Sequence, residues 1–137
     1  MIRFILLSIL SVILIGCKNY QINDYTITKF SVYSKSTSFV RETTNKNEID
    51  RFKEFLLNSI IVNEIPNEFD QFDYTHRIYI IGNDLKGKWV YNSNNGFFSK
   101  LISYKVKPVL MFQITNITKF NQFIDSIVSL HLDISND

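Results

Sequence analysis

The strongest constraint on the fold is the order in which strand-like and helix-like periodicities follow one another along the chain. Runs rich in β-branched and aromatic residues, typical of strands, occupy residues 25–33, 74–81, 88–91 and 109–114. Apolar stripes with helical spacing separate the first run from the second and follow the last. The order β-α-β-β-β-α predicts the α+β class, as a small two-layer sandwich. One antiparallel sheet of about four strands would carry two helices on one face.

Both helices have a recognisable start. Asn47 is predicted to cap the first helix, which is expected to end near residues 59–62. Its apolar stripe consists of Ile49, Phe52, Leu56 and Ile60, spaced three or four positions apart. Asn116 is predicted to cap the second helix, before a fraying tail at 130–137. The stripe of this helix consists of Ile117, Phe120, Ile124 and Ile127.

The remaining segments are predicted to be connections. Residues 34–45 are rich in Ser and Thr and are expected to form a loop. Residues 92–96 end in Asn-Gly, the pair that best accommodates the positive φ angles of a tight hairpin. Residues 97–107 fit either a strand with a bulge or a loop that ends at Pro108, and the pattern does not decide between them.

The N-terminus has the layout of a secretory signal peptide. Arg3 precedes residues 4–15, which are apolar except for two serines, and small Gly16 follows. Twelve residues of helix rise about 18 Å, whereas the hydrocarbon core of a bilayer is about 30 Å thick. The run is therefore too short for a transmembrane helix.

The end of this run, Leu14-Ile15-Gly16-Cys17, resembles the lipobox of bacterial lipoproteins. In that family a branched apolar residue and a small residue precede an obligatory cysteine. The resemblance implies that a signal peptidase cuts between Gly16 and Cys17. It also implies that a diacylglyceryl group modifies the Cys17 thiol and anchors the chain in a membrane. A soluble secreted protein with an incidental cysteine and an uncleaved anchor are the alternatives.

The same resemblance implies that residues 1–16 are the signal peptide, and it also implies a location. The polar residues after Cys17 predict a lipidated tether over residues 17–24, and the order of strand and helix patterns predicts a single α+β domain over residues 25–137. Lys18 follows the lipidated residue, where Asp retains lipoproteins in the inner membrane under enterobacterial-type sorting. We therefore expect a lipid-anchored protein of the cell envelope, on the periplasmic face of the outer membrane if the cell is Gram-negative.

Charge and cysteine content exclude two classes of protein. Cys17 is the only cysteine, so an intramolecular disulfide framework is impossible. Loss of residues 1–16 removes Arg3 from the 15 basic side chains, and those that remain nearly balance the 13 acidic ones. Binding to nucleic acid needs a basic stripe, so we expect no nucleic-acid partner.

His76 is the residue most suggestive of catalysis, but no partner for it is apparent. A general base needs a partner and a metal site needs several ligands, whereas the other histidine, His131, lies in the predicted tail. Ser93, His76 and Asp73 could be combined into a triad, yet no turn of the G-x-S-x-G kind supports that set. We expect a hydrogen-bonded sheet histidine in a protein that is not an enzyme and needs no cofactor or metal.

Acidic and aromatic residues are interleaved between residues 64 and 74. Clustered carboxylates can bind Ca²⁺, but the EF-hand order and its glycine are missing, which favours a solvated acidic loop. Exposed rings among charges also suit a protein-binding surface. The candidate partner-binding residues are Glu68, Phe69, Asp70, Phe72 and Asp73. The alternative is that both phenylalanines lie beneath a helix as part of the core.

A second cluster combines lysines with aromatic residues. Lys86 and Lys88 lie near Trp89 and Tyr91 in one predicted hairpin. Three further lysines follow at positions 100, 105 and 107. Such surfaces can hold anionic polymers or lipid headgroups, but an edge strand protected by lysines is the interpretation that we favour.

Together these features predict a membrane-tethered lipoprotein whose small domain is a non-enzymatic binding module for a protein partner. An immunity-type inhibitor of a toxin that acts in the periplasm is one specific form. The alternative is an envelope assembly or accessory factor that accepts a partner strand at its sheet edge. A cell-wall hydrolase is the third hypothesis, and it requires a pocket with two convergent carboxylates or His76.

Overall fold

One antiparallel sheet of seven strands organises the chain, in the order β2-β1-β4-β5-β6-β7-β3. The computed structural model describes residues 26–67, 69–83, 85–101 and 110–129. The strands are β1 (Ile27–Ser34), β2 (Val40–Thr43), β3 (Ile60–Ile61), β4 (His76–Gly82), β5 (Gly87–Tyr91), β6 (Phe97–Leu101) and β7 (Leu110–Gln113). The helices are α2 (Lys46–Leu57) and α3 (Ile117–Ser129).

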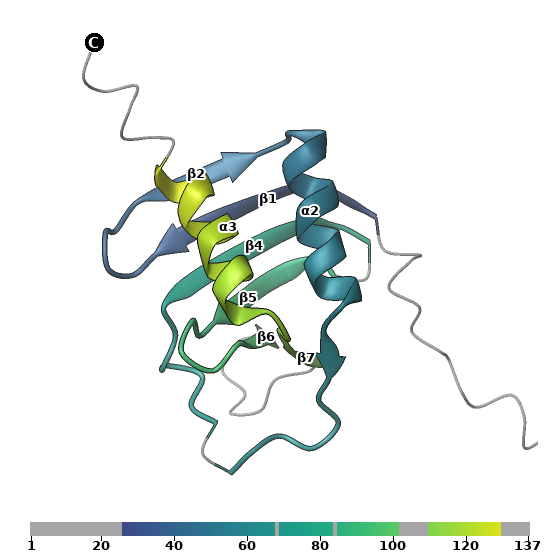
Figure 1. Ribbon diagram of the computed structural model, residues 1–137, viewed down its shortest axis with the longest axis vertical. Coiled ribbons are helices and arrows are strands. Elements are labelled where there is room, and N and C mark those ends of the chain that lie inside the picture. Colours follow the sequence, from purple (N-terminus) through teal and green to yellow (C-terminus); the bar gives the residue numbers. More distant parts are fainter. Residues whose placement is uncertain (1–25, 68, 84, 102–109, 130–137) are drawn as a thin grey trace, which may run out of the picture.

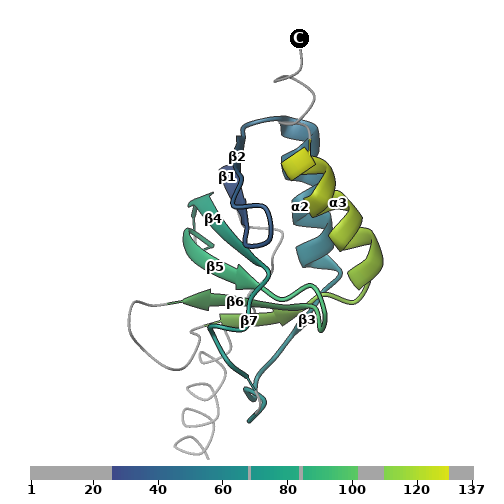
Figure 2. The ribbon, with the colours of Figure 1, turned by 90° about the vertical axis from the view of Figure 1, so that its left-hand side faces the viewer.

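Both helices lie on the same face of the sheet, and the other face carries none of the described helices (Figures 1 and 2). The α+β class and the single antiparallel sheet are therefore confirmed. The predicted number of about four strands is wrong, because the described residues form seven.

The additional strands are short or lie in segments whose residues are not typical of strands. β2 lies inside the segment 34–45 that was expected to be a loop, and it pairs with β1 through Tyr33 and Val40. β3 has only two residues, too few for a periodicity to show. Residues 97–101, for which the sequence left strand and loop open, form strand β6. Residues 102–109 lie outside the described part.

The first helix begins and ends earlier than its sequence pattern predicts. Its N-cap is Asn45, whose side-chain oxygen accepts hydrogen bonds from the backbone N–H groups of Asn47 (2.9 Å) and Glu48 (3.3 Å). The helix ends at Leu57, so Ile60 lies in β3 and does not continue the buried stripe. For α3 the predicted cap is confirmed, because Asn116 Oδ1 accepts from the N–H of Lys119 (3.2 Å).

α2 links the two opposite edges of the sheet. It follows β2 and precedes β3 in the chain, and these strands are the first and last of the sheet. Figure 1 shows α2 running across the strands from the β2 side towards β7 and β3. Arg41 of β2 fixes this arrangement, since its guanidinium donates to Glu48 of α2 (3.2 Å) and to the carbonyl of Ile127 in α3 (3.0 Å).

The core between sheet and helices is a network of aromatic rings. Phe52 of α2 stacks on Phe30 of β1, with 4.6 Å between ring centroids, and meets the edge of Phe98 at 5.9 Å. Trp89 stacks almost parallel on Phe98 at 4.5 Å. All four side chains are completely buried. Such pairs contribute about 0.5–1.5 kcal/mol each beyond the burial of their area, so Phe52 holds α2 to the sheet.

Replacement of Phe52 by Ala should lower the free energy of unfolding by about 3–5 kcal/mol, because it leaves a cavity among the rings. The matched change Phe72→Ala, on a side chain that is largely exposed, should change it by less than about 0.5 kcal/mol. Urea denaturation followed by the fluorescence of Trp89, the single tryptophan, measures both. Equal effects of the two changes would contradict the central position of Phe52.

Candidate functional site

The face of the sheet opposite the helices carries an open groove of about 820 Å³. Its side chains come from neighbouring strands: Tyr33 from β1, Arg77 and Tyr79 from β4, and Lys88 from β5. The strand register places Tyr33 opposite Arg77 and Tyr79 opposite Lys88. Because alternate residues of a strand point to opposite faces, Ile80 of β4 is buried in the core.

Arg77 is held in the groove by aromatic rings. Its guanidinium carbon lies 4.2 Å from the ring centroid of Tyr33 and 5.6 Å from that of Tyr74. The ammonium of Lys35 lies 4.7 Å from the same Tyr74 ring, so two cations share this tyrosine. A guanidinium stacked on a ring keeps its in-plane N–H donors available, which prepares it to bind an anion.

The segment between β3 and β4 brings Phe72 to this groove. Phe72 lines the groove with 70% of its surface exposed, whereas Phe69 is half-buried and lines a separate hollow of about 220 Å³. Neither side chain packs in the core beneath the helices, so the alternative that placed both phenylalanines there is wrong. Glu68, the other end of the predicted surface, lies outside the described residues.

The described carboxylates of this segment hold its conformation. Asp70 Oδ1 accepts a hydrogen bond from the backbone N–H of Phe72 (2.8 Å). The carbonyl and carboxylate oxygens of Asp73 accept from Asn92 Nδ2 at 2.8 and 3.2 Å. Among the described residues, no three His, Cys, Asp or Glu side chains come close enough to hold a metal ion. Of the four candidate partner-binding residues that the structure describes, Phe72 is thus the one that lines the groove.

The predicted lysine cluster is rearranged in space. β5 lies between β4 and β6, so the favoured interpretation of a lysine-protected edge strand is wrong. Trp89 and Tyr91 are completely buried, and they add no ring to an exposed surface. Lys88 is exposed and lines the groove. The structure therefore does contain a basic and aromatic surface, but its rings come from Tyr33, Tyr79 and the segment before β4.

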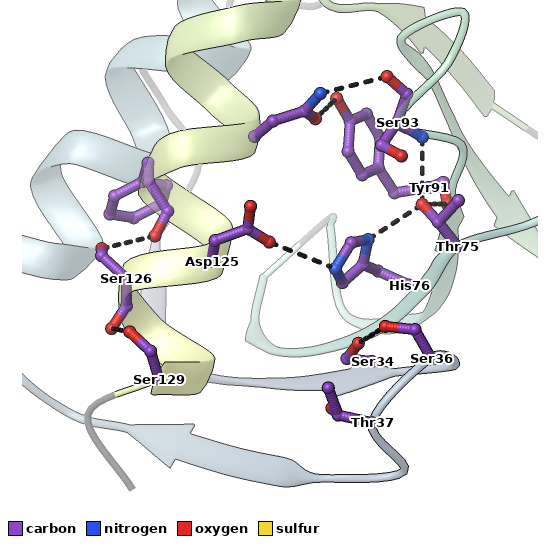
Figure 3. A network of polar contacts seen from close by, with 12 residues as sticks. Ser34, Ser36, Thr37, Thr75, His76, Tyr91, Ser93, Asp125, Ser126 and Ser129 are labelled. Atoms are coloured by element: carbon purple, nitrogen blue, oxygen red, sulfur yellow. Dashed lines mark hydrogen bonds and ion pairs between the residues drawn. The ribbon is translucent and has the colours of Figure 1, made fainter. Parts of the chain in front are cut away.

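A second cavity, a cleft of about 620 Å³, lies where the end of α3 meets the start of β4 (Figure 3). Hydroxyl groups dominate its polar lining: Ser34, Ser36, Thr37, Thr75, Ser93 and Ser129. His76 and Asp125 face one another across it, with 3.9 Å between Nε2 and Oδ1. Because this distance exceeds that of a hydrogen bond, the carboxylate interacts with His76 through its charge.

His76 is fixed in this cleft by its neighbours, as expected for a sheet histidine. Its Nδ1 is hydrogen-bonded to Thr75 Oγ1 at 2.9 Å, and Thr75 also accepts from the backbone N–H of Ser93 (3.0 Å). Asp73 is instead bonded to Asn92, so Ser93, His76 and Asp73 do not form a triad. The imidazole partners seen in Figure 3 are Thr75 and Asp125.

Burial dominates the electrostatics of this region. It lowers the pKa of His76 below its ordinary value of 6.5, although the nearby negative charge of Asp125 acts in the opposite direction. Burial and Asp125 together raise the pKa of Tyr91. The Tyr91 hydroxyl therefore stays protonated and donates to Asn121 Oδ1 (2.6 Å), while Asn121 Nδ2 donates to the Ser93 carbonyl (3.1 Å).

Comparison of the chain with models of known protein families, with curated proteins and with solved structures finds no match. Within the described residues, neither helix is long and apolar enough to span a bilayer. The predicted cleavage site at Gly16 and lipidation site at Cys17 lie outside these residues, as does His131. Geometric evidence on function thus comes from the groove and the cleft.

Sequence reasoning missed the groove residues Tyr33, Arg77 and Tyr79. Their signal was present, because Arg77 and Tyr79 alternate with buried residues along β4. Period-two alternation marks one face of a strand as outward, but only the pairing with β1 shows that Tyr33 belongs to the same surface.

Replacing His76 by Gln should make stability less sensitive to acid. The pKa of His76 is lowered in the folded state, so its stabilising contribution is present above about pH 6.5 and is lost as the pH falls further. Urea denaturation between about pH 6.5 and 5 should show a steeper loss for the wild-type protein than for H76Q. The carboxylates titrate in both proteins, so parallel curves would contradict the assignment.

Proposed function

We propose that the protein is a lipid-anchored component of the cell envelope whose domain binds a protein partner and is not an enzyme. The helix-free face of the sheet would be the binding surface. The exposure of Phe72 beside the groove is the observation that carries this proposal. Exposed aromatic side chains that gather at a groove are typical of binding surfaces, and Phe72 and Tyr79 both line this one. An immunity-type inhibitor of a periplasmic toxin is one specific form of such a module.

The anchor in this proposal is a lipid on Cys17. Each acyl chain contributes about 0.8 kcal/mol per buried CH₂, and one chain alone gives only marginal binding. The lipid of a lipoprotein has more than one chain, which suffices for stable attachment. The domain then needs no membrane-binding surface of its own, and its sheet face is available to a partner. In a Gram-negative cell the proposed location is the periplasmic face of the outer membrane.

The cleft at His76 supports binding more than hydrolysis. It meets the criterion given for the hydrolase hypothesis, since His76 lines a cavity. The described lining, however, contains one carboxylate, Asp125, whereas most glycoside hydrolases use a pair. Thr75 Oγ1 is committed to hydrogen bonds with Ser93 and Tyr91, which makes it a poor nucleophile.

A second candidate function is strand acceptance at the β3 edge, as in an assembly factor. Within the described part of the chain, β3 pairs with β7 on one side only. Ile60 and Ile61 are 58% and 38% exposed, and Leu57 at the end of α2 is exposed beside them. An edge strand with exposed apolar side chains is suited to main-chain pairing with an extended segment of another protein.

Metabolic labelling with a palmitate analogue tests the anchor. The wild-type chain should be labelled and should remain in the membrane fraction, because Cys17 is the only thiol and is the proposed site of lipidation. The Cys17→Ser chain should lose the label and be released or remain unprocessed. If neither chain were labelled, the assignment of Cys17 as the lipidated residue would be wrong.

Photo-crosslinking in living cells tests the binding surface. A photoreactive phenylalanine analogue in place of Phe72 should crosslink the full-length chain to one partner protein, because this side chain projects at the groove. The matched control position is Lys46, whose side chain is exposed on α2, on the helix side of the sheet. Position 60 tests the second candidate.

A partner captured at position 72 and absent at position 46 is the expected result. Capture at position 60 alone would favour strand acceptance at the β3 edge. Equal capture at all positions, or none at position 72, would contradict the proposed surface.

A further inference from the structure

The cations that line the groove are Arg77 and Lys88. Arg77 is exposed and stacked on Tyr33, and among the described residues it forms no ion pair with a carboxylate. Of the other two described arginines, Arg41 is bonded to Glu48. Arg51 also lies over a ring, that of Phe123, but on the helix side and outside the groove. A charged group fixed in place without a counter-ion is prepared for an external one.

The charge of the groove has one sign although the whole chain is nearly balanced. Among the described residues, its lining contains Arg77 and Lys88 and no Asp or Glu. Three tyrosines and Phe72 separate and flank these cations. The chain as a whole has 15 basic and 13 acidic side chains, so the positive character of this face is local. Local charge of one sign steers partners of the opposite sign and selects among them.

We propose that the groove binds an acidic segment of the partner protein, with a partner carboxylate on the Arg77 guanidinium. This inference rests on the proposed function, because it names the chemistry of the partner at the same face. The ring of Tyr33 covers one face of the guanidinium, so the carboxylate approaches in its plane, where two N–H donors bind two oxygens. Lys88 supplies a second, longer-range attraction.

The rings distinguish this ligand from a bare polyanion. Phe72 is 70% exposed and Tyr79 is 41% exposed, and both line the groove beside the cations. Neither ring contributes to binding a phosphate group, whereas both lose water-exposed apolar surface when a side chain of a peptide packs on them. The occupant therefore combines acidic with apolar or aromatic side chains.

Fluorescence anisotropy with short labelled peptides, measured on the purified full-length protein in detergent, tests this inference. The probes are peptides that alternate Trp with Glu, Trp with Gln, and Trp with Lys. The Glu peptide should bind about tenfold more tightly than the Gln peptide, which corresponds to one good charge-assisted contact. Added salt should weaken the Glu peptide more than the Gln peptide.

Variants assign the effect to one residue. Arg77→Gln should remove most of the preference for Glu over Gln, and Arg77→Lys should retain part of it, because Lys keeps the charge without the planar pair of donors. Arg51→Gln is the matched control, since it removes a ring-stacked arginine from the helix side. It should leave the preference unchanged. Thermal melts establish that each variant is folded.

The outcomes separate this inference from the proposed function. Equal binding of the Glu and Gln peptides overturns the carboxylate contact, yet a crosslink at position 72 would still support a protein partner. Displacement of the Glu peptide by inorganic phosphate or short-chain phosphatidylglycerol at similar concentration overturns the peptide assignment. Absence of binding by all peptides, together with no crosslink at position 72, overturns both proposals.

Discussion

The packing of Phe52 against the aromatic side chains of the sheet is the interaction on which the rest of the structure depends. It joins α2 to β1 through Phe30 and to β6 through Phe98, and Phe98 in turn stacks on Trp89 of β5. The large rings are thereby concentrated on one face of the sheet, where they cover the apolar sides of both helices. The opposite face has no helix among the described residues (Figure 2). For this reason it can carry tyrosines and cations in contact with water.

The local sequence pattern predicted the helices and the longer strands, because these elements have enough residues to show a repeat of apolar positions. Four strands and both helices follow from alternation or from helical spacing, with ends displaced by a few residues. β2 and β3 have four and two residues, and they exist because β1 and β7 offer them hydrogen-bonding partners that are distant in sequence. The helix cap illustrates the same limit. Asn45 and Asn47 are equally good capping residues, and only the backbone geometry selects Asn45.

The candidate surface was less predictable than the fold because it depends on which side chains the charged residues contact in the folded chain. Sequence composition singled out the acidic residues near Phe72, but Asp70 and Asp73 are occupied in shaping their own segment. Phe72 was identified from its neighbours in sequence. Arg77 lies in a strand whose buried apolar residues indicate a core element, so the sequence did not indicate an exposed site there. Its contact with Tyr33 joins residues 44 positions apart, which no local pattern contains.

The path of α2 from one sheet edge to the other has a consequence for how such a domain can change in evolution. One added turn lengthens a helix by about 5.4 Å, while one added strand widens a sheet by about 4.8 Å. α2 connects β2 to β3 across the full strand order with only two residues of connection at each end, so the chain has little slack to follow a change in sheet width. Gain or loss of a strand between these edges therefore requires a compensating change in the length of α2 or of these connections. Homologues of different sheet width should differ in both features together.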